Sequence, residues 1–337
     1  MDLDQLTDII QDQNARRQYS DGLELLKLIR PALDAICEKP LPQLDIDGRD
    51  HKYQHIEGGF QKTFKLAPEI FKKVSPELYE LYAAQLRGKH GLHMNTDNAF
   101  YINASRTKIS ADTASNPASL EGIGHELGHM MTPTLGKDSP LEEVPSILIE
   151  ILISEILKEY AIPGSGFTAT RLKQVNNCAK GMKAVNSFID AVSEMNIDLS
   201  GAQHTTLVSI TEQYRTHPSA NKETLATMDK FLLETNEQTH AADLQSWTFC
   251  RQTDTRGHKY EIGVILGSIL AKKIKNNEFT LKQCFDILDN TQLSSVERLA
   301  QLGITEITDD IIKDFYKFAD TKCKQMQQAY VTRETDK

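Results

Sequence analysis

Cysteine and tryptophan are scarce in this 337-residue chain, which has five cysteines and one tryptophan. An odd number of cysteines, widely spaced and without a Cys-x-x-Cys pair, argues against a disulfide framework and against a thiolate zinc site. The pattern fits a protein of a reducing compartment, in which these side chains serve as small buried hydrophobic groups. The cysteines are Cys37, Cys178, Cys250, Cys284 and Cys323.

The chain also lacks an excess of positive charge, a long apolar run and a cleavable signal peptide. Its net charge is −9, which argues against a nucleic-acid-binding protein, because such a protein needs a basic surface. The most apolar stretch, 147–157, is interrupted by Glu150 and Glu155 and is too short to span a bilayer. The first residues, MDLDQLTDIIQDQNARR, are polar and acidic, unlike a signal peptide. We therefore expect a protein located in the cytoplasm, or secreted without a cleavable signal peptide.

Helical periodicity dominates what is present. A strand is expected over 98–109, where the sequence is NAFYINASRTKI. A helix is expected to begin at Pro117, with Asn116 as its N-cap, and a second helix is expected over about 141–160. Leucine and isoleucine repeat at helical spacing through the first 40 residues, and similar patterns cover roughly 168–196, 203–215, 222–236, 258–276, 280–289 and 307–330.

The most informative stretch, GIGHELGHMM, lies on the helix expected after Pro117. His125 and His129 are four residues apart, so they share one helix face, one turn from each other. Both imidazoles can then reach one zinc ion at about 2.0–2.1 Å. Glu126 projects beside them, placed to take a proton from zinc-bound water, whose pKa zinc lowers to about 7. This arrangement predicts metal-assisted hydrolysis.

Two glycines interrupt the same helix. Gly124 and Gly128 each cost roughly 1 kcal/mol of helix stability relative to alanine. Glycine at such positions is typical of a helix that another segment approaches closely. We expect a strand or a bound substrate segment on that side.

A catalytic zinc site needs a third protein ligand and one open coordination position. Downstream of the motif the candidates are Asp138, Glu142, Glu143 and Glu150. Glu143 and Glu150 are seven residues apart and would share a helix face. Glu142 near a helix N-terminus is also explained as a solvated acid that the helix dipole favours.

The segments HELGHMM and EEVPSILIE together resemble the M3 oligopeptidases, including oligopeptidase F and thimet-type enzymes. The resemblance implies a gluzincin, in which the glutamate before Val-Pro-Ser, here Glu143, is the third zinc ligand, with Glu142 kept as the alternative. It also matches Glu150 to a further acid of the family, which would hydrogen-bond a ligand imidazole or form a structural salt bridge. The chain departs from the family in the short separation of His129 and Glu143 and in Thr132, where many members have a third histidine.

A later stretch, RGHKYEIGVILGSILA, is similar to the Tyr-x-x-Gly helix of oligopeptidase F relatives. The similarity implies that Tyr260 donates a hydrogen bond to the oxyanion and that His258 contacts the substrate or the oxyanion. A surface histidine and a half-buried tyrosine at a helix start are the alternative. In gluzincins an edge strand often binds the substrate backbone, and the strand at 98–109 has the matching position, unless it is a plain core strand.

Taken together, these patterns predict a mostly α fold with a zincin-like helical catalytic domain and one small β-sheet beside the active-site helix. Residues 1–45 would form an N-terminal helical segment, 46–330 the catalytic domain and 331–337 a tail. The predicted function is a Zn²⁺-dependent metallopeptidase that hydrolyses a peptide or protein substrate, without nucleic acid and without a membrane span. The alternatives are a non-enzymatic zincin-like binding module and a host-directed bacterial effector protease with one protein substrate.

Overall fold

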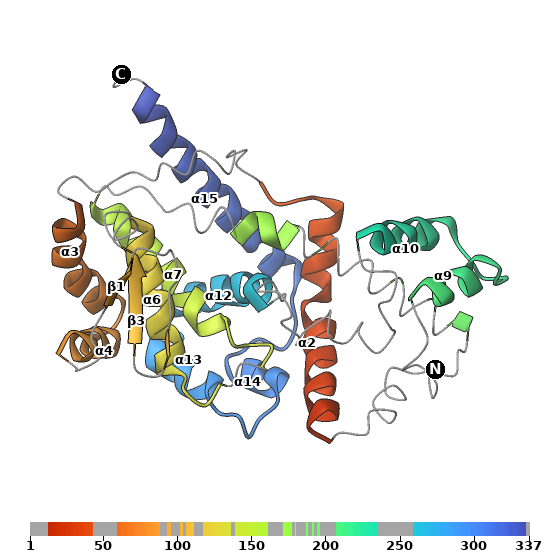
Figure 1. Cartoon of the computed structure of the whole chain (residues 1–337), viewed down its shortest axis with the longest axis horizontal. Coiled ribbons are helices and arrows are strands. Elements are labelled where there is room, and N and C mark those ends of the chain that lie inside the picture. Colours follow the sequence, from red (N-terminus) through yellow and green to blue (C-terminus); the bar gives the residue numbers. More distant parts are fainter. Residues whose placement is uncertain are drawn as a thin grey trace.

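The protein is mostly helical in the computed structural model (Figure 1). Among the described helices α2 and α15 are the longest, and α6 and α12 pack against α7. The structure describes residues 13–42, 59–87, 93–95, 102–103, 106–110, 117–135, 139–160, 171–176, 179, 187, 191, 194–195, 207–234 and 259–334. The elements are α2 (Gln13–Glu38), α3 (Gly59–Val74), α4 (Pro76–Arg87), β1 (His93–Asn95), β2 (Ile102–Asn103), β3 (Arg106–Ser110), α6 (Pro117–Met131), α7 (Val144–Leu157), η1 (Lys158–Tyr160), α9 (Leu207–Arg215), α10 (Lys222–Glu234), α12 (Lys259–Lys275), α13 (Leu281–Leu288), α14 (Ser295–Gln301) and α15 (Asp309–Glu334).

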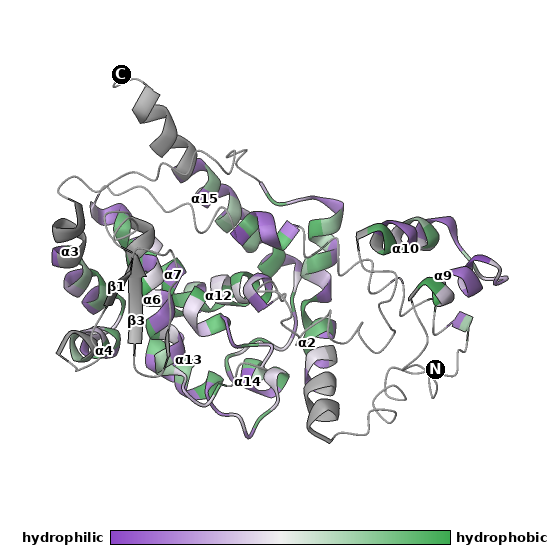
Figure 2. Cartoon of the chain, viewed as in Figure 1, coloured by the Kyte–Doolittle hydropathy of each residue, from purple (hydrophilic) through white to green (hydrophobic). Residues whose placement is uncertain are grey.

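Helix α7 lies at the centre of the core. Every residue from Val144 to Ser154 is buried, including the polar Ser146 and Glu150. A helix that is apolar on all sides needs neighbours on all sides, and α6, α12 and α3 pack against it. Figure 2 shows mainly hydrophobic and neutral positions along α12, whereas α10 and the coloured part of α15 carry many hydrophilic ones. The core therefore surrounds the helix that follows Glu143.

Glycines let both α6 and α12 approach α7 closely. A Cβ at Gly128 of α6 would lie 2.7 Å from the Cα of Ser146, and a Cβ at Gly263 of α12 would lie 3.1 Å from the carbonyl oxygen of Glu143. A Cβ contact as short as the first distance is essentially never observed, and one as short as the second is rare. The neighbour of Gly124 and Gly128 is thus helix α7, and the expectation of a strand or substrate segment on that side is wrong. The glycines do allow a close approach, as expected, but the segment that approaches them is a helix.

We expect Gly128→Ala to destabilise the fold, with Gly267→Ala of α12 as its matched control. At position 267 the nearest atom, the backbone nitrogen of Leu148, would lie 3.3 Å from the new Cβ. Overpacking at position 128 should lower the free energy of unfolding by about 1–3 kcal/mol, despite the gain of about 1 kcal/mol in helix propensity that both variants share. Urea unfolding followed by circular dichroism measures both changes. Equal stability of the two variants would contradict helix–helix contact through Gly128.

Short polar side chains set several helix starts. The Ser75 hydroxyl accepts a hydrogen bond from the Leu78 backbone N–H at 3.0 Å at the start of α4. Thr280 and Ser294 form capping boxes at the starts of α13 and α14, which satisfy backbone donors that a helix start leaves free. Helix α6 begins at Pro117 as expected, while Asn116 lies outside the described residues.

Strand pairing is confined to three short segments in the part of the chain that the structure describes. Strand β3 pairs in parallel with β1 and antiparallel with β2, with Ile102 opposite Thr107. The single strand expected over 98–109 therefore contains two antiparallel pieces. These short pairings do not establish the small β-sheet that was expected beside the active-site helix. That sheet stays a prediction.

The outer helices cover the centre from several sides. Helices α3 and α4 pack on each other at one side, and α9 and α10 pair on the far side of α2 (Figure 1). Buried side chains of α2, such as Leu25 and Ile29, belong to the same hydrophobic core as those of α7, and α15 continues to Glu334. The division at 45 and 330 stays a prediction. Among the described residues, no helix is long and apolar enough to cross a bilayer.

Candidate metal centre

Two histidines of α6 lie one helical turn apart beside the start of α7. The ring centroids of His125 and His129 are 4.9 Å apart and the rings are nearly perpendicular, at 82°. The His125 side chain is 10% exposed and that of His129 is 25% exposed. One imidazole is thus enclosed, and the other lies closer to solvent.

Glu143 completes a group of three possible metal ligands. It is the N-cap residue of α7, yet its carboxylate makes no capping hydrogen bond, and Pro145 at the second helical position has no N–H to offer. Its Oε2 atom lies 3.2 Å from Nε2 of His125 and 3.6 Å from Nε2 of His129. The ligand atoms of these three residues all lie within 4.8 Å of one another, and the group could hold a metal ion.

The separations between the donor atoms suit ligands of one tetrahedral ion. Ligands about 2.0–2.1 Å from a tetrahedral zinc lie about 3.3 Å apart, close to both measured separations. Oε2 of Glu143 is buried and has no hydrogen-bond partner in the described structure, although Nε2 of His125 is within reach. The two atoms are therefore not aligned as donor and acceptor, and a buried carboxylate oxygen in that state is costly unless a cation compensates it.

Glu150 fixes the orientation of the His125 ring. Two turns along α7 from Glu143, its Oε1 atom lies 2.6 Å from Nδ1 of His125, and both groups are buried. We assign a proton to Nδ1, because a carboxylate can only accept, and Nε2 is then the nitrogen directed away from Glu150 and toward Glu143. Nη2 of Arg171 lies 3.4 Å from the same Oε1 atom. Glu150 thus makes both contacts that were considered as alternatives, a hydrogen bond to an imidazole and a salt bridge.

The charges around the histidines favour a cation. Burial lowers the pKa of His125, but its contacts with Glu143 and Glu150 outweigh burial and raise the pKa to about 10. Burial lowers the pKa of His129 to about 4, so this ring is a neutral lone-pair donor at pH 7. Burial would raise the pKa of Glu143, but His125 and His129 hold it below its ordinary value. With a pKa of about 10 the His125 ring carries a second proton at pH 7, and a metal ion would bind Nε2 by displacing that proton. The site thus offers one neutral imidazole, a second imidazole that a bound cation would deprotonate, and an ionised carboxylate.

Glu142, the alternative third ligand, points to a different partner. Its Oε2 atom lies 2.5 Å from Nζ of Lys259, the first residue of α12. Lys259 is buried, so the pair links the segment before α7 to α12. Of the two neighbouring glutamates, the geometry brings Glu143 to the histidines and Glu142 to a lysine.

Two further predicted residues, Glu126 and Tyr260, lie at the edge of this group. Glu126 follows His125 on α6 and is partly exposed, and burial raises its pKa. The Tyr260 ring stacks on His125, with centroids 6.2 Å apart and planes at 14°. Burial also raises the pKa of the Tyr260 phenol, which keeps it a neutral hydrogen-bond donor. His258 lies outside the described residues, as do half of the positions 98–109 that were expected to form the substrate-binding strand.

Arg171 is the residue of this region that sequence reasoning missed. Its guanidinium lies over the Tyr260 ring, 4.1 Å from the centroid, in addition to its contact with Glu150. The Tyr260 ring is therefore flanked by a cation and by an imidazole, and the guanidinium connects it to the carboxylate behind His125. A lone arginine in a helical pattern has no spacing signal, so only the tertiary structure could identify it.

Comparisons with known proteins add little to this geometry. No family model matches the chain, and no curated protein matches its sequence. A solved structure named as a "putative peptidase" from Chlamydophila abortus is similar at 13% identity and a TM-score of 0.43. The match covers 92% of this chain and 54% of that one, so the chain spans about half of that protein's length. A likeness at this level assigns neither fold nor function, and the site stands on its own geometry.

Proposed function

We propose that the chain is a zinc-dependent peptidase of the gluzincin type, in which His125, His129 and Glu143 hold the metal. The observation that carries the proposal is the convergence of these three donor atoms from two separate helices, at separations that suit one tetrahedral ion. Two imidazoles and one carboxylate with a further open position are the donor set of catalytic zinc. Bound there, zinc acts as a Lewis acid on a carbonyl oxygen and lowers the pKa of a coordinated water.

Glu126 would move the protons of the reaction. It lies beside His125 in sequence but faces a partly open environment, and burial raises its pKa toward neutrality. A carboxylate with a raised pKa can accept a proton from the attacking water and later donate it to the leaving amine. The same oxygen atoms perform both transfers, so one residue serves as base and then as acid.

Tyr260 would stabilise the negative charge that develops on the carbonyl oxygen. Its phenol stays neutral, and its ring is held between His125 and the guanidinium of Arg171. A donor whose ring is fixed in advance loses little reorganisation energy in the transition state. We propose Arg171 as a positioning residue, because it contacts both Tyr260 and Glu150. His258 as a substrate contact stays a prediction from sequence.

Metal analysis combined with peptide cleavage tests the proposal. The purified full chain is expected to retain about one zinc ion per chain and to cleave members of a proteome-derived peptide library, detected by mass spectrometry. A phenanthroline chelator should abolish cleavage and added zinc should restore it, whereas the non-chelating isomer of phenanthroline should have no effect. Zinc binding without cleavage of any peptide would refute the peptidase and leave a metal-binding module.

A further inference from the structure

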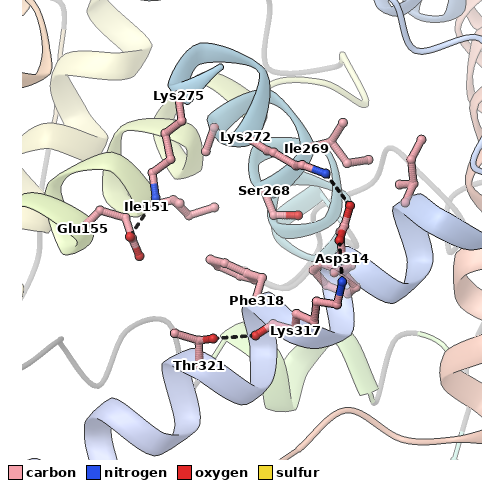
Figure 3. A pocket seen from close by; sticks show the side chains of 13 residues that line it. Ile151, Glu155, Ser268, Ile269, Lys272, Lys275, Asp314, Lys317, Phe318 and Thr321 are labelled. Atoms are coloured by element: carbon pink, nitrogen blue, oxygen red, sulfur yellow. Dashed lines mark hydrogen bonds and ion pairs between the residues drawn. The ribbon is translucent and has the colours of Figure 1, made fainter. Parts of the chain in front are cut away.

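A pocket lies near the C-terminal ends of α7 and α12, whose N-terminal ends lie beside the metal centre. It has a volume of about 300 Å³ and is lined by residues of α7, α12 and α15 (Figure 3). Glu155 at this pocket is 12 residues along α7 from Glu143, which corresponds to about 18 Å at the rise of an α-helix. The pocket shares no residue with the metal centre, and the proposal for it does not depend on the proposed peptidase activity.

The inner wall of the pocket is apolar. Ile151, Ile269 and Phe315 line it and are themselves buried, and Phe318 extends its ring across the opening in Figure 3. A volume near 300 Å³ is at the lower end of ligand pockets, enough for an aliphatic chain of moderate length. Burial of that chain would contribute free energy in proportion to the apolar area removed from water.

The rim of the pocket carries more positive than negative charge. Three lysines surround the Glu155 carboxylate, with Nζ–O distances of 2.7 Å for Lys275, 2.7 Å for Lys158 and 2.5 Å for Lys322. Burial would raise the pKa of Glu155, but these lysines, Lys322 foremost, hold it well below its ordinary value. The carboxylate is therefore ionised and is shared by several ammonium groups. Of these lysines only Lys275 lines the pocket, and burial lowers the pKa of Lys322 to about 8, so Lys275 and Glu155 balance each other on this side of the rim.

The excess of positive charge lies on the other side of the rim. Lys272 and Lys317 both pair with Asp314 of α15, so two ammonium groups share one carboxylate. Figure 3 shows Lys272, Lys275 and Lys317 around the same opening. The C-terminal ends of α7 and α12 lie here and offset part of the excess. Even so, the rim remains positive around an apolar interior, in a chain whose net charge is −9.

We propose that this pocket binds an amphipathic anion with a single aliphatic tail, a medium-chain carboxylate. The tail would fill the space between Ile151, Ile269 and Phe315. The carboxylate would lie at the rim, where Lys272 and Lys275 can share it with Asp314 and Glu155. A neutral alkyl ligand leaves the excess charge uncompensated, and a short anion leaves the apolar wall exposed to water, so each should bind much less well.

Titration calorimetry of the full chain with dodecanoate, below its critical micelle concentration, tests the proposal. Dodecanoate should bind, and dodecanol and acetate should bind at least about tenfold more weakly, which corresponds to about 1.4 kcal/mol. Added salt should weaken the binding of dodecanoate, because screening acts on the rim charges. Absence of dodecanoate binding, or equal affinity for dodecanol, would overturn the proposal.

Two variants locate the binding site, and a third serves as their control. The double variant Lys272→Gln/Lys275→Gln should bind dodecanoate about five- to tenfold more weakly, as expected for two partly exposed charges. Ser268→Leu, which places an aliphatic side chain in the pocket without changing charge, should weaken binding by about tenfold or more. Lys282→Gln removes a similarly exposed lysine of α13, paired with Asp286, and should leave affinity unchanged. Binding that is unaffected by Ser268→Leu would place the ligand elsewhere and overturn the proposal, provided that thermal unfolding shows the variant to be folded.

Discussion

Replacing Glu126 by glutamine is expected to reduce peptide hydrolysis by about 10²- to 10⁴-fold while leaving metal content unchanged. Glutamine has nearly the same shape as glutamate but cannot accept the proton of the attacking water. The metal would stay bound, because Glu126 is outside the group formed by His125, His129 and Glu143. The decisive measurement is a single preparation analysed both for zinc by mass spectrometry and for cleavage of the best library peptide.

The pH profile adds a second readout to the Glu126→Gln experiment. The raised pKa of Glu126 should appear in the acid limb of kcat/KM for the native chain and should be missing from any residual activity of the variant. Native-like activity in the variant would rule out Glu126 as the base. A loss of zinc together with activity would instead assign Glu126 to the metal.

The second large effect is expected from Glu143→Gln, with Glu142→Gln as its matched control. Removing an outer hydrogen bond to a ligand costs about 10- to 100-fold in metal affinity, so loss of the ligand carboxylate itself should cost more than about 100-fold. Cleavage should disappear with the metal. Competition between the protein and a zinc-binding dye measures the affinity directly and does not require activity.

Glu142→Gln is expected to lower the stability of the fold and to leave metal affinity almost unchanged. Glu142→Gln removes the carboxylate that pairs with Lys259, whose side chain is 4% exposed, so the free energy of unfolding should fall. Metal affinity should change by no more than about threefold, because the carboxylate is directed to α12 and away from the histidines. If Glu142→Gln lost zinc and Glu143→Gln retained it, the assignment of the third ligand would be reversed.

The sequence was sufficient to predict most of the proposed centre. Spacing alone placed His125 and His129 on one helix face, and the resemblance to M3 oligopeptidases selected Glu143 among the nearby acids. Local signals also predicted the start of α6 at Pro117. The shared helix face and the helix start could be predicted because they depend on contacts within one or two turns of helix, whereas Glu143 as a ligand stays a prediction.

Predictions that depended on distant neighbours were less successful. The glycines of α6 correctly indicated a close approach, but the partner was α7 and not a strand, because the pattern of one helix contains nothing about what packs on it. Arg171 was missed for the same reason. Helix α14, with its capping box at Ser294, is only seven residues long and too short to give a clear period.

Close contact through Gly128 means that the distance between the backbones of α6 and α7 is set there by main-chain atoms. Substituting nearby apolar side chains should therefore change the separation of these two backbones little. Adapting this protein to a larger or softer ion is then expected to require new ligand types at these positions more than a repacked surrounding core.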